Sequence, residues 1–392
     1  MNKNNTIKLH NYVIALCPIF LIFYISNETY AIDYRAFYLA GKSVLYGLNP
    51  YLNHISLDSD FYGPVNSELS KFSGWKYPPI ASYLFAPLAI LPYEVSKNLF
   101  NLISLLSASL LTFSIIKKRI FIINPDALLI VGISFPVLAT ISRGQVEILI
   151  VCAALLSLYF YKKGNLFLSS TIIAILGFIK VFPLLLAVTF IKIKKKTKFF
   201  AYLTISFLLI YLLNLILCPI EWRLSFIERI TIPWDQMPQG NLKELPDNLG
   251  IIKDTMMVRT SDARNLFHSH FFVFGFANPL LSSNLFLSGI IGTIGSLICL
   301  IKYSKYSFSL CFFAIMNWIN IVNPISWIMG LFWYVPLFLF SYEKVKTPLR
   351  ILIIFPLILP PFLNISGYLA CIISLFITNF FSKESLKEIK NI

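Results

Sequence analysis

Charged residues are scarce in this chain of 392 residues. Asp, Glu, Lys and Arg make up 13% of the sequence and hydrophobic residues 57%, whereas a soluble domain carries about 25% charged residues. This shortage argues against a soluble fold. Many apolar runs reach the roughly 17 to 20 residues that a helix needs to cross a bilayer, and lipid offers the backbone no hydrogen-bond partner. The sequence therefore predicts an all-α polytopic membrane protein with one integral membrane domain, residues 1–392.

The short motifs of several enzyme classes are also missing. The sequence has no glycine-rich phosphate loop, no HExxH and no GxSxG, so nothing points to a P-loop enzyme, a zinc peptidase or an α/β-hydrolase. The six cysteines form no CxxC pair and lie in or beside apolar runs, which is typical of small buried residues. His268 and His270 have no evident third ligand. We predict no metal site and no cofactor.

Basic residues exceed acidic ones, which gives a net charge of +15. Such an excess is common in nucleic-acid-binding proteins, but here it is concentrated in short loops between apolar runs, as the positive-inside rule requires of cytoplasmic loops. We therefore expect membrane lipids, and no nucleic acid, as partners. The basic clusters are Lys117 to Arg119, Lys162 with Lys163, Lys192 to Lys198, Lys302 with Lys305, Lys344 to Arg350, and the C-terminal lysines.

Counting crossings between these clusters predicts about 12 transmembrane helices with both termini in the cytoplasm. Pro78 to Pro92 is predicted to enter the membrane without a full crossing. The stretch from Lys163 to Lys192 is predicted to form two short helices, because proline breaks a helix and Pro183 lies near its middle.

The same path leaves two long loops outside, residues 27–77 and 219–280. It also brings Arg143 to Glu147, Lys180 and residues 323–327 to this non-cytoplasmic face. We therefore expect a protein of the plasma (inner) membrane with its active site on the extracytoplasmic face.

Asp33 is the first candidate for chemistry, since it follows the first apolar run by a few residues. A carboxylate at the edge of the lipid can accept a proton from a hydroxyl group during group transfer. The alternative is that Asp33 caps a helix over the next residues, Tyr34 to Tyr46. Asp58, Asp60 and Glu68 are rival acids in an ordinary solvated loop.

Four cations, Arg35, Lys76, Arg143 and Lys180, are expected near the same surface. A charge inside an apolar segment is costly and indicates function, and Lys180 is the clearest case. It is suited to neutralising a lipid-linked phosphate, or alternatively it reaches the headgroups as a snorkelling lysine. Glu147 follows Arg143 by four residues, a spacing that pairs side chains along a helix.

Five sequence blocks, taken in order, resemble glycosyltransferase family 87. Each block is weak alone, and the five together span residues 33–327. The blocks are Asp33 to Gly41 with Gly47 to Tyr51, Tyr77 to Pro79, Gly144 to Val146, Ile179 and Lys180 with Pro183, and Asn323 to Trp327, which is similar to a Ser-Pro-x-Ser-Trp motif.

The resemblance implies a GT-C-like fold and an inverting transfer of a sugar, typically mannose or another hexose, from a polyprenyl-phosphate donor to a lipid or glycan hydroxyl. It implies that Asp33 is the general base. Lys180 is then the first candidate for binding the donor phosphate, with Lys76 and Arg143 in reserve, and the 219–280 loop closes over the substrates. The substrate-binding candidates are Arg35, Tyr38, Asn49, Tyr77, Gln145, Asn323 and Trp327.

The chain departs from the family pattern at Glu147, where asparagine is frequent, at Asn323, and at Met329, near which a histidine is frequent. These departures leave the specificity open and allow an inactive member. Two other functions fit a similar helix count: a transporter or flippase for a lipid-linked sugar, and an O-antigen polymerase or ligase that uses a diphosphate carrier.

Overall fold

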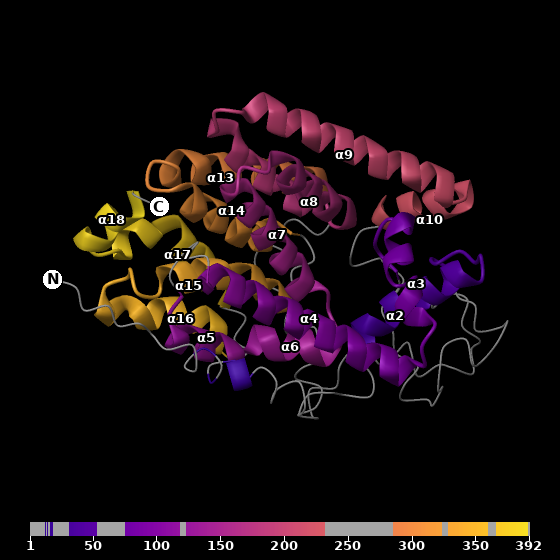
Figure 1. The fold of residues 1–392 in the computed structure, drawn as a ribbon, viewed down its shortest axis with the longest axis horizontal. Helices are drawn as coiled ribbons and strands as arrows, with labels where there is room; N and C mark the ends of the chain where they lie inside the picture. Colours follow the sequence, from indigo (N-terminus) through magenta and orange to yellow (C-terminus); the bar gives the residue numbers. More distant parts are fainter. Residues whose placement is uncertain are drawn as a thin grey trace.

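The computed structural model describes residues 12, 14, 16–18, 31–52, 75–117, 123–231, 285–323, 328–359 and 366–390. These residues form helices, apart from turns and one isolated β-bridge between Val345 and Phe381 (Figure 1). The all-α prediction is thereby confirmed for the described part of the chain.

The helices follow one another along the chain with few long breaks. The first half contains α2 (Ile32–Leu45), η2 (Pro79–Leu84), α3 (Ala86–Ala89), α4 (Tyr93–Lys117), α5 (Pro125–Gly132), α6 (Phe135–Arg143), α7 (Glu147–Lys162), α8 (Leu166–Ile179), η3 (Phe182–Lys192), α9 (Lys196–Leu217) and α10 (Ile220–Thr231). The second half contains α13 (Leu285–Tyr303), α14 (Phe308–Val322), η9 (Ile328–Tyr334), α15 (Val335–Ser341), η10 (Thr347–Leu349), α16 (Arg350–Ile358), α17 (Ser366–Phe380) and α18 (Lys383–Lys390).

Three of the described helices are long and apolar enough to cross a membrane: α4 over Tyr93–Ile116, α9, and α13 over Phe286–Tyr303. The pair α5 and α6 forms a fourth candidate, bent by 48° at its break. Several other helices are apolar but shorter. The total of about 12 crossings stays a prediction.

Helix α9 has the least buried apolar window of the three candidate membrane spans. Only 11% of its apolar window is buried, and its outer side exposes Leu208, Leu212 and Ile216. At about 1.5 Å per residue, its 22 residues span roughly 33 Å, the thickness of a bilayer core. In Figure 1 this helix runs along one edge of the molecule. These exposed apolar side chains are therefore suited to contact with lipid.

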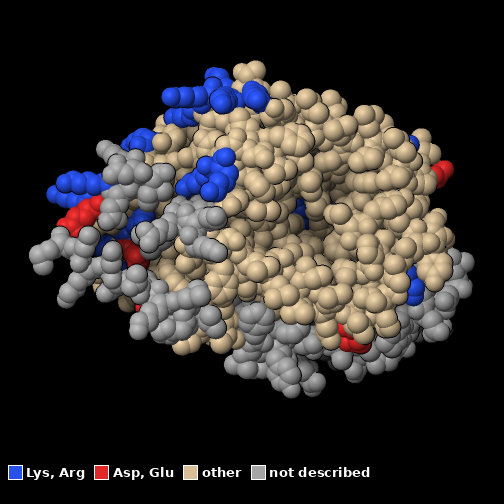
Figure 2. All heavy atoms as spheres, viewed as in Figure 1, with Lys and Arg blue, Asp and Glu red and all other residues tan. Residues whose placement is uncertain are grey.

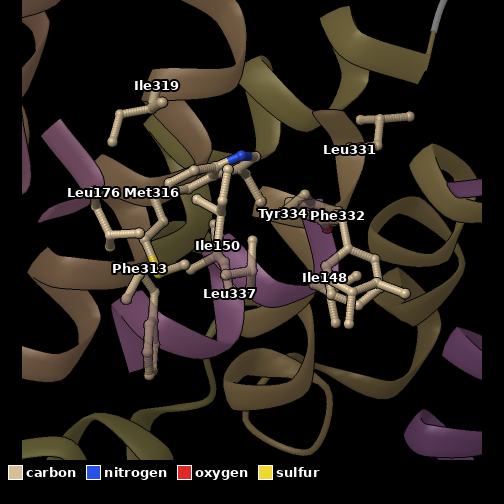
Figure 3. Close-up of a cluster of buried hydrophobic side chains, with 14 of the residues drawn as sticks. Ile148, Ile150, Leu176, Phe313, Met316, Ile319, Leu331, Phe332, Tyr334 and Leu337 are labelled. Carbon is tan, nitrogen blue, oxygen red and sulfur yellow. The ribbon is translucent and has the colours of Figure 1, made fainter. Parts of the chain in front are cut away.

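One cluster of buried apolar side chains lies where α7, α8, α14, η9 and α15 meet. Ile148 and Ile150 of α7, Met316 of α14, and Leu331 and Leu337 from the following segment are buried there (Figure 3). This packing fixes the start of α7 against η9, and both of these elements contribute to the charge cluster described below.

The stretch from Lys163 to Lys192 forms two short helices, as predicted. Helix α8 ends at Ile179, Lys180 has an extended backbone, and η3 begins at Phe182 with Pro183 in its first turn. A side chain on Gly177 would lie 2.3 Å from Leu184, so the absence of one lets the two helices pack closely. Lys180 therefore lies at a helix break, where its side chain is free of the helical register.

Pro78 to Pro92 contains η2 and α3, which are six and four residues long. Neither is long enough to cross a bilayer core of about 30 Å. Asn214 of α9 accepts a hydrogen bond from the Ile80 backbone N–H at 3.2 Å, and Tyr83 donates to the Leu217 carbonyl at 2.8 Å. These bonds fix η2 to the end of α9.

Basic residues gather at one end of the molecule, where Figure 1 places α18 and the C-terminus. Figure 2 shows most of the Lys and Arg atoms of this face near that end. Loops far apart in sequence meet there: the Lys192 ammonium donates to Ser304 at 2.9 Å, and the Lys346 backbone N–H to the Phe380 carbonyl at 2.8 Å. The elements α2, α3 and α10 lie at the other end.

The turn between α6 and α7 presses directly against α2. Gly144 ends α6 with a φ of +66°, and a Cβ added to it would lie 2.4 Å from the Cβ of Tyr34 and 3.3 Å from that of Ala31. Tyr34 is itself fixed, since its ring stacks on Phe100 and its hydroxyl bonds to Ser96 at 2.5 Å. Glycine at 144 therefore allows both the left-handed backbone and the close approach of the two helices.

Gly144→Ala is expected to lower the thermal unfolding temperature of the detergent-solubilised protein strongly. The left-handed conformation alone costs a residue with a side chain roughly 1–2 kcal/mol, and the collision with Tyr34 adds to this cost. Gly164→Ala is the matched control, because Gly164 has a φ of +78° but nothing within 4 Å of the added Cβ. Equal losses in the two variants would contradict the proposed close packing.

Candidate functional site

Asp33 and Arg143 form a buried ion pair although they are far apart in the sequence. Asp33 lies in the first turn of α2 and Arg143 is the last residue of α6. Two hydrogen bonds join them, Arg143 Nε to Asp33 Oδ2 at 2.5 Å and Nη2 to Oδ1 at 3.1 Å. The side chains are only 7% and 6% exposed. Such a fork-shaped contact fixes the plane of the carboxylate as well as its position.

The alternative interpretation of Asp33 as the helix cap is wrong. Helix α2 begins at Ile32, so Ala31 holds the N-cap position and Asp33 lies inside the first turn. A carboxylate in the first turn is still favoured by the helix dipole, and here it also binds Arg143.

A second ion pair joins Glu147 to Lys180. Glu147 is the first residue of α7 and Lys180 follows the end of α8. The Lys180 ammonium donates to Glu147 Oε1, and the indole N–H of Trp333, in η9, donates to Oε2 at 2.9 Å. The Glu147 carboxylate thus connects the start of α7 to Lys180, after α8, and to Trp333 in η9.

Glu147 does not pair with Arg143 through an i,i+4 helical contact, as its spacing had indicated. Helix α6 ends at Arg143, Gly144 takes the left-handed conformation, and α7 begins only at Glu147. The two side chains therefore belong to different helices. Arg143 binds Asp33, and Glu147 binds Lys180.

Tyr77 lies beside the Glu147–Lys180 pair. The Lys180 ammonium lies 5.9 Å from the centre of the Tyr77 ring, and the Tyr77 carbonyl accepts a hydrogen bond from the Tyr51 hydroxyl at 2.5 Å. Burial raises the pKa of the Tyr77 phenol to about 12, Lys180 acts against this rise, and the charges of Glu147 and Asp33 add to it. Arg143 and Glu147 lie on the two sides of one short turn, so the two ion pairs form a single cluster.

We call Asp33, Arg143, Glu147 and Lys180 the charge cluster. It contains two carboxylates and two cations, so its formal charge is zero. Burying ions costs free energy that only close pairing offsets, and removing one partner leaves an uncompensated buried charge. Lys180 has the most exposed side chain of the four, at 21%. Figure 2 shows a hollow near the middle of this face with Lys or Arg atoms inside it.

The other predicted site residues on α2 and the turn after it have structural contacts. Arg35 lies 5.9 Å from the centre of the Tyr93 ring, and the Tyr38 hydroxyl donates to the Leu91 carbonyl at 2.9 Å. Both are buried. Asn49 donates to Ser225 of α10 at 3.0 Å and ties the end of α2 to that helix.

The remaining candidates lie in different places. Lys76 and Gln145 are half-buried, and Gln145 directly precedes the Val146–Glu147 start of α7. Asn323 is the C-cap of α14, whereas Trp327 lies outside the described residues. So do the rival acids Asp58, Asp60 and Glu68, the two histidines, and residues 232–280 of the predicted large loop. Within the described part of the chain, no group of His, Cys, Asp and Glu is arranged to hold a metal ion.

Trp333 is the residue that sequence reasoning missed. Its indole is one of many aromatic side chains in an apolar run, and no spacing relates it to Glu147, 186 residues earlier. The charges gave a weak signal for the role of Glu147 but not for that of Trp333, since two cations in apolar surroundings require two acids close to them.

Comparison with known families bears on the same residues. Residues 75–261 match the model of glycosyltransferase family 87. This match, over slightly less than half of the chain, supports a membrane protein of glycosyltransferase family 87. No curated protein and no solved structure gives a significant match.

The family 87 match includes Tyr77, Arg143, Glu147 and Lys180, while Asp33 and Trp333 lie outside the matched residues. The family implies a membrane glycosyltransferase, which uses a sugar donor and an acceptor. The apolar helices of the structure agree with an integral membrane protein of this kind.

Trp333→Phe is expected to destabilise the protein more than Trp318→Phe. The Trp333 indole donates to a carboxylate, and hydrogen bonds to charged groups contribute roughly 1.5–3 kcal/mol, against about 0.5–1.5 kcal/mol for neutral ones. Trp318 donates to the neutral Gly292 carbonyl at 3.0 Å. Thermal unfolding in detergent measures both losses, and an equal or smaller loss for Trp333→Phe would count against the carboxylate bond.

Proposed function

We propose that this family 87 protein transfers a hexose, with mannose as the first candidate, from a polyprenyl-phosphate donor to a hydroxyl group of a lipid or glycan acceptor. In this proposal the transfer inverts the anomeric carbon and Asp33 is the general base. The observation that carries it is the charge cluster, where residues from distant parts of the sequence form two buried ion pairs on the two sides of one turn.

Asp33 has the chemistry that a base requires. Two hydrogen bonds from the Arg143 guanidinium fix the position and orientation of its two oxygens. Each carboxylate oxygen has two lone pairs, so an oxygen that already accepts one hydrogen bond can accept a second from the acceptor hydroxyl. The acceptor oxygen then bonds to the anomeric carbon, the bond from that carbon to the phosphate oxygen breaks, and Asp33 takes the hydroxyl proton. The polyprenyl phosphate leaves with the electron pair.

Lys180 suits the leaving phosphate. Negative charge builds up on the phosphate as its bond to the sugar breaks, and a fixed cation nearby stabilises that charge most where water is excluded. Lys180 is the most exposed member of the charge cluster and lies at a helix break. Lys76 and Arg143 remain secondary candidates, and Arg143 already binds Asp33 through two nitrogens.

The charge distribution supports an extracytoplasmic site. Basic loops gather at one end of the molecule, which the positive-inside rule assigns to the cytoplasm. Arg143, Glu147 and Lys180 lie at the helix ends opposite to Lys162 and Lys192. We therefore propose that transfer takes place at the outer side of the plasma membrane, where the acceptor is a lipid or an envelope glycan.

Asp33→Asn is expected to lower sugar transfer by roughly 10²–10⁴-fold, the contribution of a positioned general base. Transfer of radiolabelled mannose from a polyprenyl-phosphate donor in reconstituted liposomes measures it. Asp126→Asn is the control, because Asp126 is an exposed acid in the first turn of α5 and its loss should leave transfer unchanged.

Asp33→Asn also leaves Arg143 without its charged partner, so instability must be separated from loss of the base. The double variant Asp33→Asn, Arg143→Gln restores charge balance and should recover thermal stability towards that of the wild-type protein, but not activity. Recovery of transfer in the double variant would contradict the role of Asp33 as the base.

A further inference from the structure

Glu147 differs from the other acid of the charge cluster in how its two oxygens are used. One oxygen binds Lys180 and the other binds the Trp333 indole N–H at 2.9 Å. The Glu147 side chain is 9% exposed, whereas that of Lys180 is 21% exposed. The carboxylate is thus anchored by η9, and the lysine is the more exposed partner of the pair.

We infer that Glu147 is a positioning residue that competes with the carrier phosphate for Lys180 and so promotes release of the polyprenyl-phosphate product. This inference rests on the proposed function. Its basis is the contact between Lys180 and a buried carboxylate that Trp333 holds in place.

The competition follows from charge. A phosphate oxygen that approaches the Lys180 ammonium also approaches the Glu147 carboxylate, and the two anions repel each other. The charge cluster has no formal net charge without a ligand, so a bound phosphate makes the site negative. Converting Glu147 to a neutral side chain leaves the site with one positive charge to receive the phosphate.

The repulsion is stronger for the product than for the donor. A phosphodiester such as the donor carries one negative charge, whereas a phosphate monoester carries about −1.5 to −2 at pH 7. Glu147 therefore weakens binding of the released carrier more than binding of the donor. A buried acid beside the phosphate-binding lysine then favours turnover over tight binding.

The test compares wild-type protein with Glu147→Gln in detergent by isothermal titration calorimetry. The probes are farnesyl phosphate as the monoester and methyl farnesyl phosphate as the diester. We expect Glu147→Gln to bind the monoester roughly tenfold more tightly, a change that corresponds to about 1.4 kcal/mol, and the diester by a smaller factor. In turnover assays, both kcat and the KM for the donor should fall.

Two further variants make the measurement specific. In a Lys180→Met background, Glu147→Gln should tighten binding by a clearly smaller factor, since the cation for which it competes is gone and only its direct repulsion of the phosphate remains. Glu94→Gln is the matched control, because Glu94 forms the other Lys–Glu pair among the described residues, with Lys97 at 2.7 Å, and is expected to leave both affinities unchanged.

Trp333→Phe offers a second route if Glu147→Gln does not fold. This variant keeps the charge of Glu147 but removes the indole N–H that donates to its carboxylate. The carboxylate should then bind Lys180 more tightly, and monoester binding should weaken by about two- to threefold.

Unchanged or weaker monoester binding in a folded Glu147→Gln variant would overturn the inference while leaving the proposed function intact. So would equal tightening in the Lys180→Met background. If neither the wild-type protein nor Glu147→Gln binds either probe, the proposed function and the inference both fail.

Discussion

The candidate site depends on the turn between α6 and α7, because the buried charged residues on its two sides, Arg143 and Glu147, bind different partners. Arg143 reaches back to Asp33 on α2, and Glu147 reaches Lys180 at the break after α8. Charges in apolar surroundings must be paired, so these four residues bring three distant parts of the chain to one place. The candidate site thus lies where the buried charges of these segments are paired.

Packing around the turn makes that pairing specific. Gly144 allows the turn to lie against Tyr34 of α2, and the apolar core below α7 fixes η9, which brings Trp333 to Glu147. The helix break at Lys180 frees a lysine from the helical register. Glu147 is thus a buried acid with two partners, and Lys180 is the most exposed member of the charge cluster. This arrangement suits the proposed binding and release of an anionic carrier.

The sequence predicted the class of the fold and the chemical types in the site, but not their pairing. Low charge and long apolar runs predicted the helical membrane protein, and Pro183 predicted the break at Lys180. The contacts of Asp33 with Arg143 and of Glu147 with Lys180 join residues 110 and 33 positions apart, which local spacing cannot reveal. The i,i+4 interpretation of Arg143 and Glu147 failed because a left-handed glycine separates their helices.

The most direct measurement of the central claim is a cryo-electron microscopy structure of the protein in lipid nanodiscs with a prenyl phosphate bound. The charge cluster as carrier site predicts the phosphate within hydrogen-bond distance of the Lys180 ammonium, on the side facing the Asp33 carboxylate, with the prenyl chain passing into lipid. A phosphate bound at another cation, with the Glu147–Lys180 and Asp33–Arg143 pairs sealed away from it, would contradict the account.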